Sequence, residues 1–164
     1  LSGGGGSDLI YGNLGADRLV GGAGDDTLFG GQQADDTYGL DGHDAVYCNK
    51  QNDNVYGGLG NDSVYGGQQD DHVYGNEGDD RVDGNRGDDT LFGGNGADHF
   101  VLSKGSDVAN DFTLGEDVIE TSQAFSSLTQ SIAGNDLILT AQSGDSLTLI
   151  GVNTALTTND FSFI

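Results

Sequence analysis

Eleven aspartates recur every nine residues without a gap over most of this chain. They are Asp8, Asp17, Asp26, Asp35, Asp44, Asp53, Asp62, Asp71, Asp80, Asp89 and Asp98. A fixed period of this kind is typical of solenoids, in which each repeat is one structural unit stacked on the next. The period therefore constrains the architecture before any single segment is considered.

Each nine-residue unit joins a glycine-rich turn to a short strand. The eleven units run from Gly3 to Val101; position one is Gly except at Cys48, position six is always Asp, and position eight is apolar except at Thr37. Glycine permits positive φ, and alternate strand residues face opposite sides. We expect six turn residues and three strand residues per unit, with position eight buried and its two neighbours pointing outward.

Stacking is what allows such short strands to form a core. A single strand cannot bury its apolar side chain, but strands of successive units can do so if they alternate between two facing sheets. Two units, or 18 residues, then complete one coil, and coils lie about 4.8 Å apart. The repeat predicts an all-β fold, a right-handed parallel β-roll over residues 1–101.

The composition excludes several classes of partner and demands another source of stability. The formal net charge is −22, only 34% of residues are hydrophobic, and Pro, Met and Trp are absent. Such a chain repels nucleic acids and anionic lipid, and it has no segment that could span a membrane. Because this composition is also typical of disorder, we expect a disordered chain without cations and a folded one with them.

The repeat resembles that of a known family. Residues 21–29 read GGAGDDTLF, which fits the G-G-x-G-x-D-x-U-x pattern of calcium-binding β-helices, and residues 3–101 keep this register. The chain is therefore similar to the RTX family of calcium-binding secreted proteins. The resemblance implies a calcium β-helix, export by the type I secretion machinery, and an extracellular or cell-surface location.

The family also implies a ligand set. Each Ca²⁺ would lie between the turns of units n and n+2, and would be held by the Asp of both turns and by backbone carbonyls of positions one to four. Asp107, in a decayed twelfth unit at residues 102–110, would add one aspartate. The carbonyl ligands would come from Gly4, Gly6, Asn13, Gly15, Gly21, Gly22, Ala23, Gly24, Gly39, Leu40, Asp41, Gly42, Gly57, Gly58, Leu59, Gly60, Gly75, Asn76, Glu77, Gly78, Asn85, Gly87, Gly93 and Asn95.

Calcium suits these ligands better than other metals do. It accepts carboxylates and carbonyls together, whereas Mg²⁺ gives up its water reluctantly and Zn²⁺ prefers nitrogen and sulfur. The alternative is that each Asp merely caps its turn, which eleven aspartates in phase disfavour. Up to ten ions would fit between the turns and nearly cancel the charge of −22.

Three glutamines interrupt one of the two aspartate columns that an 18-residue coil creates. Gln33, Gln51 and Gln69 replace the fourth-position Gly, where a residue other than Gly at positive φ costs about 1 kcal/mol. We expect weaker or absent calcium between these turns, with a ladder of Gln side chains as one possible replacement.

The outward position nine is rich in aromatic residues. One face is expected to carry Tyr11, Phe29, Tyr47 and Tyr65, and the other Tyr38, Tyr56, Tyr74 and Phe92. These ladders stabilise a thin sheet by about 0.2–1 kcal/mol per pair. Alternatively, they form a surface for a polysaccharide or protein partner, as in the R-modules of alginate epimerases. The absence of Lys and Arg expected on these faces weakens the case for an acidic glycan.

Residues 102–164 are expected to form a β-rich cap on the last coil, whose unpaired backbone must be covered. Phe100 and Phe112 are candidate plugs, and residues 136–140 and 146–150 predict two strands around a turn at 142–145. The C-terminal sequence, residues 160–164, resembles an uncleaved type I secretion signal and is also compatible with a last edge strand. Because the chain opens without Met or a signal peptide, we expect a fragment or processed product.

No catalytic constellation accompanies the repeats. The chain lacks the G-x-S-x-G, H-E-x-x-H and P-loop motifs, and His72 and His99 are three units apart and should lie on opposite faces. We interpret these two, His43 and Cys48 as tolerated surface residues, and the chain as a non-catalytic module. Its parent is expected to be either a larger secreted enzyme or a surface adhesin whose aromatic faces are the working part.

Overall fold

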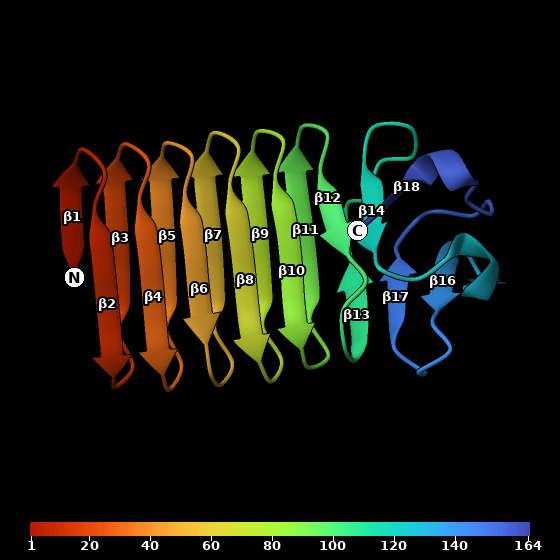
Figure 1. Cartoon of the computed structure of the whole chain (residues 1–164), viewed down its shortest axis with the longest axis horizontal. Coiled ribbons are helices and arrows are strands. Elements are labelled where there is room, and N and C mark those ends of the chain that lie inside the picture. The colour runs from red at the N-terminus through yellow and green to blue at the C-terminus, as the bar shows by residue number, and fades with distance from the viewer.

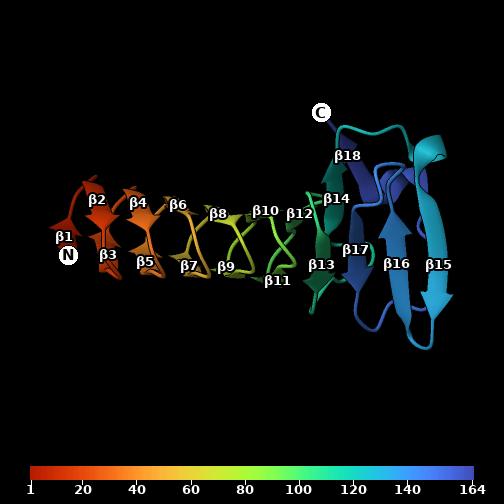
Figure 2. The ribbon, with the colours of Figure 1, turned by 90° about the horizontal axis from the view of Figure 1, so that it is seen from below.

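The structure is a computed structural model that describes all 164 residues. Two sheets face each other along a thin roll, and the C-terminal part forms a wider end (Figures 1 and 2). The ten-stranded sheet contains, in spatial order, β1 (Ser2–Gly5), β3 (Arg18–Ala23), β5 (Asp36–Asp41), β7 (Asn54–Leu59), β9 (His72–Glu77), β11 (Thr90–Asn95), β13 (Ser106–Ala109), β17 (Ser146–Leu149), β16 (Asp136–Thr140) and β15 (Thr129–Ala133).

The opposite sheet has eight strands. In spatial order they are β18 (Phe161–Phe163), β14 (Val118–Thr121), β12 (His99–Val101), β10 (Arg81–Arg86), β8 (Ser63–Gln68), β6 (Ala45–Asn49), β4 (Thr27–Gln32) and β2 (Leu9–Leu14). Two short 3-10 helices, η1 (Phe125–Ser127) and η2 (Thr158–Asp160), lie in the C-terminal part.

The strand register confirms the predicted coil. Neighbouring strands within the repeats are parallel and offset by 18 residues, as in Leu28↔Val46 and Val46↔Val64. Consecutive units therefore alternate between the sheets, and two units make one coil. The parallel β-roll that the sequence predicts is confirmed.

The strands are longer than the three residues expected from the repeat. A typical strand such as β4 covers six residues and includes positions one to three of the following unit. In most units, the residues at positions six, eight and one are buried and face inward. The residues at positions seven and nine between them are mostly of intermediate exposure and face outward. The glycine-rich positions lengthen the strands because their backbone groups also pair with the next coil. The types of side chain along the repeat do not reveal this pairing.

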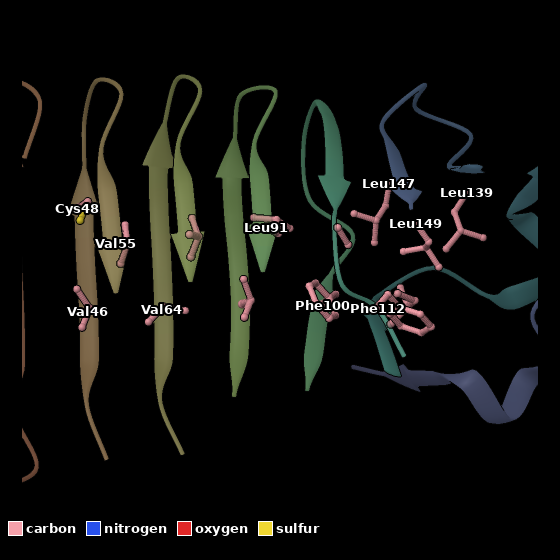
Figure 3. Close-up of a cluster of buried hydrophobic side chains, with 14 of the residues drawn as sticks. Val46, Cys48, Val55, Val64, Leu91, Phe100, Phe112, Leu139, Leu147 and Leu149 are labelled. Atoms are coloured by element: carbon pink, nitrogen blue, oxygen red, sulfur yellow. The ribbon is translucent and has the colours of Figure 1, made fainter. Parts of the chain in front are cut away.

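The core is a thin layer of side chains from the two facing sheets (Figure 3). The position-eight side chains from Leu19 to Phe100 are fully buried, and Ile10 in the first coil is nearly so. Each coil contributes one such side chain per sheet, so the core is narrow. Burying a Leu or Val contributes about 1.5–3 kcal/mol. Because each coil buries only two such side chains, the roll needs further stabilisation from its turns.

One pair of exceptions occurs together in this core. Thr37 is the polar residue at position eight, Cys48 is the side chain at position one, and both are fully buried with Oγ1 and Sγ 2.9 Å apart. The interpretation of Cys48 as a surface residue is therefore wrong. Thr37 therefore supplies a polar partner for the Cys48 thiol within an otherwise apolar core.

The C-terminal residues continue both sheets before they cover the end. Strand β13 pairs with β11, and β14 pairs with β12. The predicted strands at 136–140 and 146–150 form the antiparallel pair β16 and β17. Phe112 packs against Phe100 with ring centroids 5.8 Å apart, as expected for plugs, and β18 is the edge strand of its sheet.

The outer aromatic residues form the two predicted ladders. Neighbouring rings are stacked with centroids 4.7–5.1 Å apart and planes within 11°. Arg18 covers the ring of Tyr38 at one end of the ladder that runs to Phe92, and Arg81 covers the ring of Tyr65 at one end of the ladder that begins at Tyr11. The ring faces inside each ladder therefore contact each other, so between the end rings mainly edges and hydroxyls remain for a partner.

Candidate metal sites

The aspartates form two columns, one along each edge of the roll. The odd column holds the Asp of units one, three, five, seven, nine and eleven, and the even column holds the others. In each column the backbone N–H of one Asp donates to Oδ1 of the Asp in the next coil, at 2.7–3.1 Å. Oδ1 therefore joins neighbouring coils, which differs from the alternative interpretation that each Asp caps its own turn.

The second carboxylate oxygen has no partner. Oδ2 of all eleven repeat aspartates, from Asp8 to Asp98, is buried without a hydrogen bond. An unpaired buried carboxylate oxygen is costly, because a buried charge needs a partner or a metal. Eleven equivalent oxygens in two straight rows thus indicate a repeated ligand of positive charge.

Glycine at position one is explained by this oxygen. A Cβ added at Gly21 or Gly39 would collide with Oδ2 of the Asp in the same unit. Cys48 is the one position-one residue with a side chain, and its Sγ lies 2.9 Å from Thr37 Oγ1. Position one is thus kept small so that the free oxygen has space beside the backbone.

The environment of the columns disfavours the ionised carboxylates. Burial raises the pKa of Asp53, Asp62, Asp89 and Asp98 to about 7 and that of Asp71 to about 8. The N–H bond from the preceding coil opposes this effect, and neighbouring carboxylates of the column add to it for Asp62 and Asp71. A cation bound between the carboxylates would reverse this balance.

Most turns are joined by a second regular bond. The N–H at position four donates to the position-three carbonyl of the next coil, as in Gly24 N to Asp41 O at 2.7 Å and Gly60 N to Glu77 O at 2.8 Å. A carbonyl oxygen has two lone pairs, so these predicted carbonyl ligands keep one acceptor site. This bond holds the two turns at a fixed spacing.

The three glutamine turns lack this bond. Gln33, Gln51 and Gln69 do adopt positive φ, at 72–78°, whereas glycines at position four have φ of 93–146°. Their N–H groups donate to no backbone carbonyl, although the equivalent bonds exist at Gly15 and Gly87 in the same column. A side chain restricts φ to the narrow left-handed region, so these turns cannot open as the glycine turns do.

The glutamine side chains do not replace that bond with one another. All three are exposed, and no hydrogen bond joins them. Strand β6, which runs into the Gln51 turn, pairs with β8 over only three residues. The aspartates of these turns keep their free Oδ2, so what distinguishes the even column is its backbone.

Both columns end in rungs with no free oxygen. Oδ2 of Asp107 accepts the Ser103 hydroxyl at 2.8 Å, and Oδ2 of Asp117 accepts the Thr113 N–H at 2.7 Å. Asp117 continues the odd column and was missed from the sequence, because its offset from Asp98 is 19 residues instead of 18. The 12-residue segment 106–117 therefore supplies hydrogen-bonded ends for both columns.

The residues predicted to supply carbonyl ligands lie in the turns beside the columns. Positions one to four of neighbouring turns stack with 18-residue register, as in Gly22↔Leu40 and Leu40↔Gly58. No group of three or more His, Cys, Asp or Glu side chains forms. Any ion must therefore be completed by carbonyls, and an all-oxygen set suits Ca²⁺.

The remaining titratable groups include three histidines and a network around Arg81. His43 is exposed in a turn, and His72 and His99 lie on β9 and β12 in opposite sheets, as predicted. Arg81 forms a buried network that sequence reasoning missed: it contacts Glu120 at 2.7 Å and Asp83 at 3.2 Å. This network joins β10 to β14 and so ties the repeats to the C-terminal part.

A scan against family models identifies the repeats. The model of the RTX calcium-binding nonapeptide repeat, four copies long, matches residues 2–37, 11–46, 38–73, 49–82 and 74–109. These matches together span residues 2–109, which is more than half of the chain. No curated protein matches it, and it contains no helix with the length and hydropathy of a membrane span.

Solved structures to which this chain is similar include chains from Azotobacter vinelandii and Serratia marcescens. The AlgE6R3 subunit of the Azotobacter vinelandii mannuronan C5-epimerase is 22% identical, with 95% of this chain and 79% of that chain covered and a TM-score of 0.44. The extracellular lipase LipA of Serratia marcescens is 17% identical, with 93% and 40% covered and a TM-score of 0.40.

Proposed function

Because this chain belongs to the family of proteins built from RTX calcium-binding nonapeptide repeats, we propose that its roll folds when calcium binds between the coils. The observation that carries the proposal is the row of eleven buried Oδ2 atoms without partners. Calcium would supply the positive charge that these rows lack, and it accepts six to eight oxygen ligands of the kind that the turns offer. Magnesium and zinc fit the all-oxygen, largely backbone ligand set less well.

The chain's own residues would divide the work in a regular way. The two aspartates of neighbouring coils face the gap between them, and the carbonyls of positions one to four complete the set. In the odd column, Gly22, Gly24 and Asp26 would act with Gly39, Asp41 and Asp44. Five such gaps separate the six free carboxylates of the odd column, and four separate the five of the even column.

Two further gaps, between Asp89 and Asp107 and between Asp98 and Asp117, differ from these nine. Their outer aspartates already accept the Ser103 hydroxyl and the Thr113 N–H, so we expect these gaps to hold calcium less tightly. The sequence alone allowed up to ten sites, with fewer if the glutamine turns bind calcium weakly or not at all. We propose that the number filled at moderate calcium is lower, with the odd column filled first.

Folding and binding would be coupled through charge. Without calcium, stacked carboxylates in a chain of net charge −22 oppose the compact state. With calcium, the free energy of binding becomes free energy of folding. Low calcium inside a cell would keep the chain unfolded and competent for type I secretion, and higher calcium outside would fold it as a stabilising module of a larger secreted protein.

Circular dichroism tests this proposal directly. In chelator at neutral pH the chain should give a coil spectrum, and calcium should convert it to a β spectrum, whereas magnesium at the same concentration should not. A chain that remains fully β in chelator would refute calcium-driven folding. A magnesium response equal to that of calcium would refute the metal assignment.

A second candidate function is binding of an extracellular polysaccharide. Its original basis, stacking of sugars on flat aromatic faces, is weakened because the rings stack on each other. An open hollow of about 660 Å³ beside Tyr47 and Tyr65, lined also by Arg86 and Lys104, supports it on different grounds. The expectation that the outer faces lack Lys and Arg is wrong.

A further inference from the structure

The two outer faces of the roll differ in charge. Four of the five basic residues lie on the eight-stranded sheet or directly after its strands, and the fifth, Arg18, lies on the opposite sheet. Outward positions of the ten-stranded sheet carry Asp36, Asp41 and Glu77. The eight-stranded face is therefore basic within a chain whose overall charge is strongly negative.

Three of these cations form a column beside the aromatic ladder. Position three of the even units holds Leu14, Gln32, Lys50, Gln68, Arg86 and Lys104. Arg86 pairs in register with both Gln68 and Lys104, so successive members lie about one strand spacing, roughly 4.8 Å, apart. We name Lys50, Arg86 and Lys104 the basic column.

The basic column is exposed and has no ion-pair partner. All three side chains are exposed, and the ion pairs of the chain involve only Arg81 and His99 as cations. Asp83 lines the same hollow but is buried and held by Arg81. Asp70 and Asp88, in nearby turns, accept backbone N–H groups of the next coil.

Two adjoining hollows, which we together name the track, lie between this column and the aromatic ladder. The hollow of about 660 Å³ contains Arg86 and Lys104, and a second hollow of about 360 Å³ contains Lys50, Tyr11 and Phe29. Asn49 lines both hollows, so they adjoin along one face. The matching hollow on the opposite face contains Asp41 and Glu77 instead.

The chemistry of the track indicates the class of ligand. The hydroxyls of Tyr11, Tyr47 and Tyr65 make no hydrogen bond within the protein, and the amides of Asn49, Gln68 and Asn85 line its floor. Guanidinium and ammonium groups bind carboxylates, while hydroxyls and amides suit sugar hydroxyls. Nucleic acid fits poorly, because its binding relies on free aromatic faces that are here covered by neighbouring rings.

We propose that the track on the eight-stranded face binds an extended acidic polysaccharide, with its carboxylates on Lys50, Arg86 and Lys104. The inference requires a folded roll, and it rests on the proposed function only because calcium is proposed to fold that roll. It names a ligand class and a face, which the calcium sites do not. The ring edges and hydroxyls of the ladder line the other side of the track.

Calorimetry with an oligogalacturonate as the probe, at saturating calcium, tests this site. The triple variant K50Q/R86Q/K104Q should bind at least about tenfold more weakly than the natural chain, a loss of about 1.4 kcal/mol. Arg18→Gln is the matched control, because it removes an exposed positive charge from the opposite face and should leave affinity unchanged. A neutral xylo-oligosaccharide of equal length should not bind.

Circular dichroism of each variant separates this test from that of the fold. A failure of calcium-driven folding appears in the dichroism, whereas a failure of the ligand site appears in the calorimetry of the folded chain. The proposal is overturned if oligogalacturonate does not bind, or if the triple variant binds it as well as the natural chain does, which would indicate bridging by calcium alone. Equal binding of single-stranded DNA, with the same sensitivity to the triple variant, would also overturn it.

Discussion

The two edges of the roll carry the same aspartates but different turns. In both columns an N–H of one coil holds Oδ1 of the next, and Oδ2 is free. Only the odd column also keeps the bond between positions four and three in all of its repeat-to-repeat turns, from Gly6 to Gly78. The comparison teaches that carboxylates alone do not define the proposed calcium sites. The carbonyl ligands also depend on the conformation of the turn, and only glycine at position four reaches the wider φ of 93–146°.

The largest expected effect falls on both edges together. Ending the chain after Val101 removes β13 and β14, which pair with the last repeat strands, and exposes Phe100 by removing Phe112. Loss of a large core aromatic alone costs about 3–5 kcal/mol, so calcium should no longer fold the chain, or should do so only at much higher concentration. An unchanged calcium titration in circular dichroism would show that residues 102–164 are not needed as a cap.

A matched pair of substitutions separates the columns. Asp62→Asn and Asp53→Asn each remove one charged oxygen from a middle coil with equal burial. We expect Asp62→Asn to raise the calcium midpoint of folding by about tenfold, or about 1.4 kcal/mol, because it damages two well-formed sites. Asp53→Asn, between two glutamine turns, should have a clearly smaller effect, and equal shifts in the two titrations would remove the distinction between the columns.

Restoring glycine should make the even column resemble the odd one. The triple variant Q33G/Q51G/Q69G relieves a strain of about 1 kcal/mol per turn and allows the wider φ seen at Gly24 and Gly42. Calcium stoichiometry, measured by equilibrium dialysis, should increase, and the midpoint should fall. The control is Q32G/Q68G, at position three with ordinary φ, and an identical response from that variant would argue against the turn geometry.

Acid should act on both columns alike. Burial raises the folded-state pKa of Asp62 to about 7 and of Asp71 to about 8, whereas an unfolded Asp titrates near about 3.9. The folded state therefore binds protons more tightly, so this contribution is fully present below about pH 4 and is lost as pH rises through about 7–8. Chelated protein should gain β signal when the pH is lowered from about 8 to about 5, even in the triple glycine variant. A loss of β signal on acidification would contradict the assigned direction.

Much of the architecture follows from the period, because identical units can bury their side chains only by stacking. The row from Leu19 to Phe100, the two aromatic ladders and the 18-residue coil were all predictable from it. The length of the strands was not, because it depends on backbone bonds at glycines that carry no pattern of polarity. Cys48 and Thr37 illustrate the same limit: each is anomalous alone, and only the coil brings them into contact.

The candidate site could be predicted from the sequence to about the same extent as the architecture. The columns follow from Asp at position six, and the left-handed glutamines follow from their replacement of Gly. The oxygen that remains free, the bonds missing at Gln33, Gln51 and Gln69, and the closed rungs at Asp107 and Asp117 depend on distances between coils. Asp117 escaped prediction because one inserted residue breaks the register, and the basic column escaped because its members are 18 or 36 residues apart.

The central claim is that calcium occupies the gaps between aspartates and does so unequally along the two edges. An anomalous-scattering map of calcium-grown crystals measures this gap by gap. We predict strong calcium peaks in the five odd-column gaps from Asp8 to Asp98, and weak or absent peaks between Asp35 and Asp53 and between Asp53 and Asp71. Full occupancy in those two gaps, or an odd column without peaks, would contradict the account.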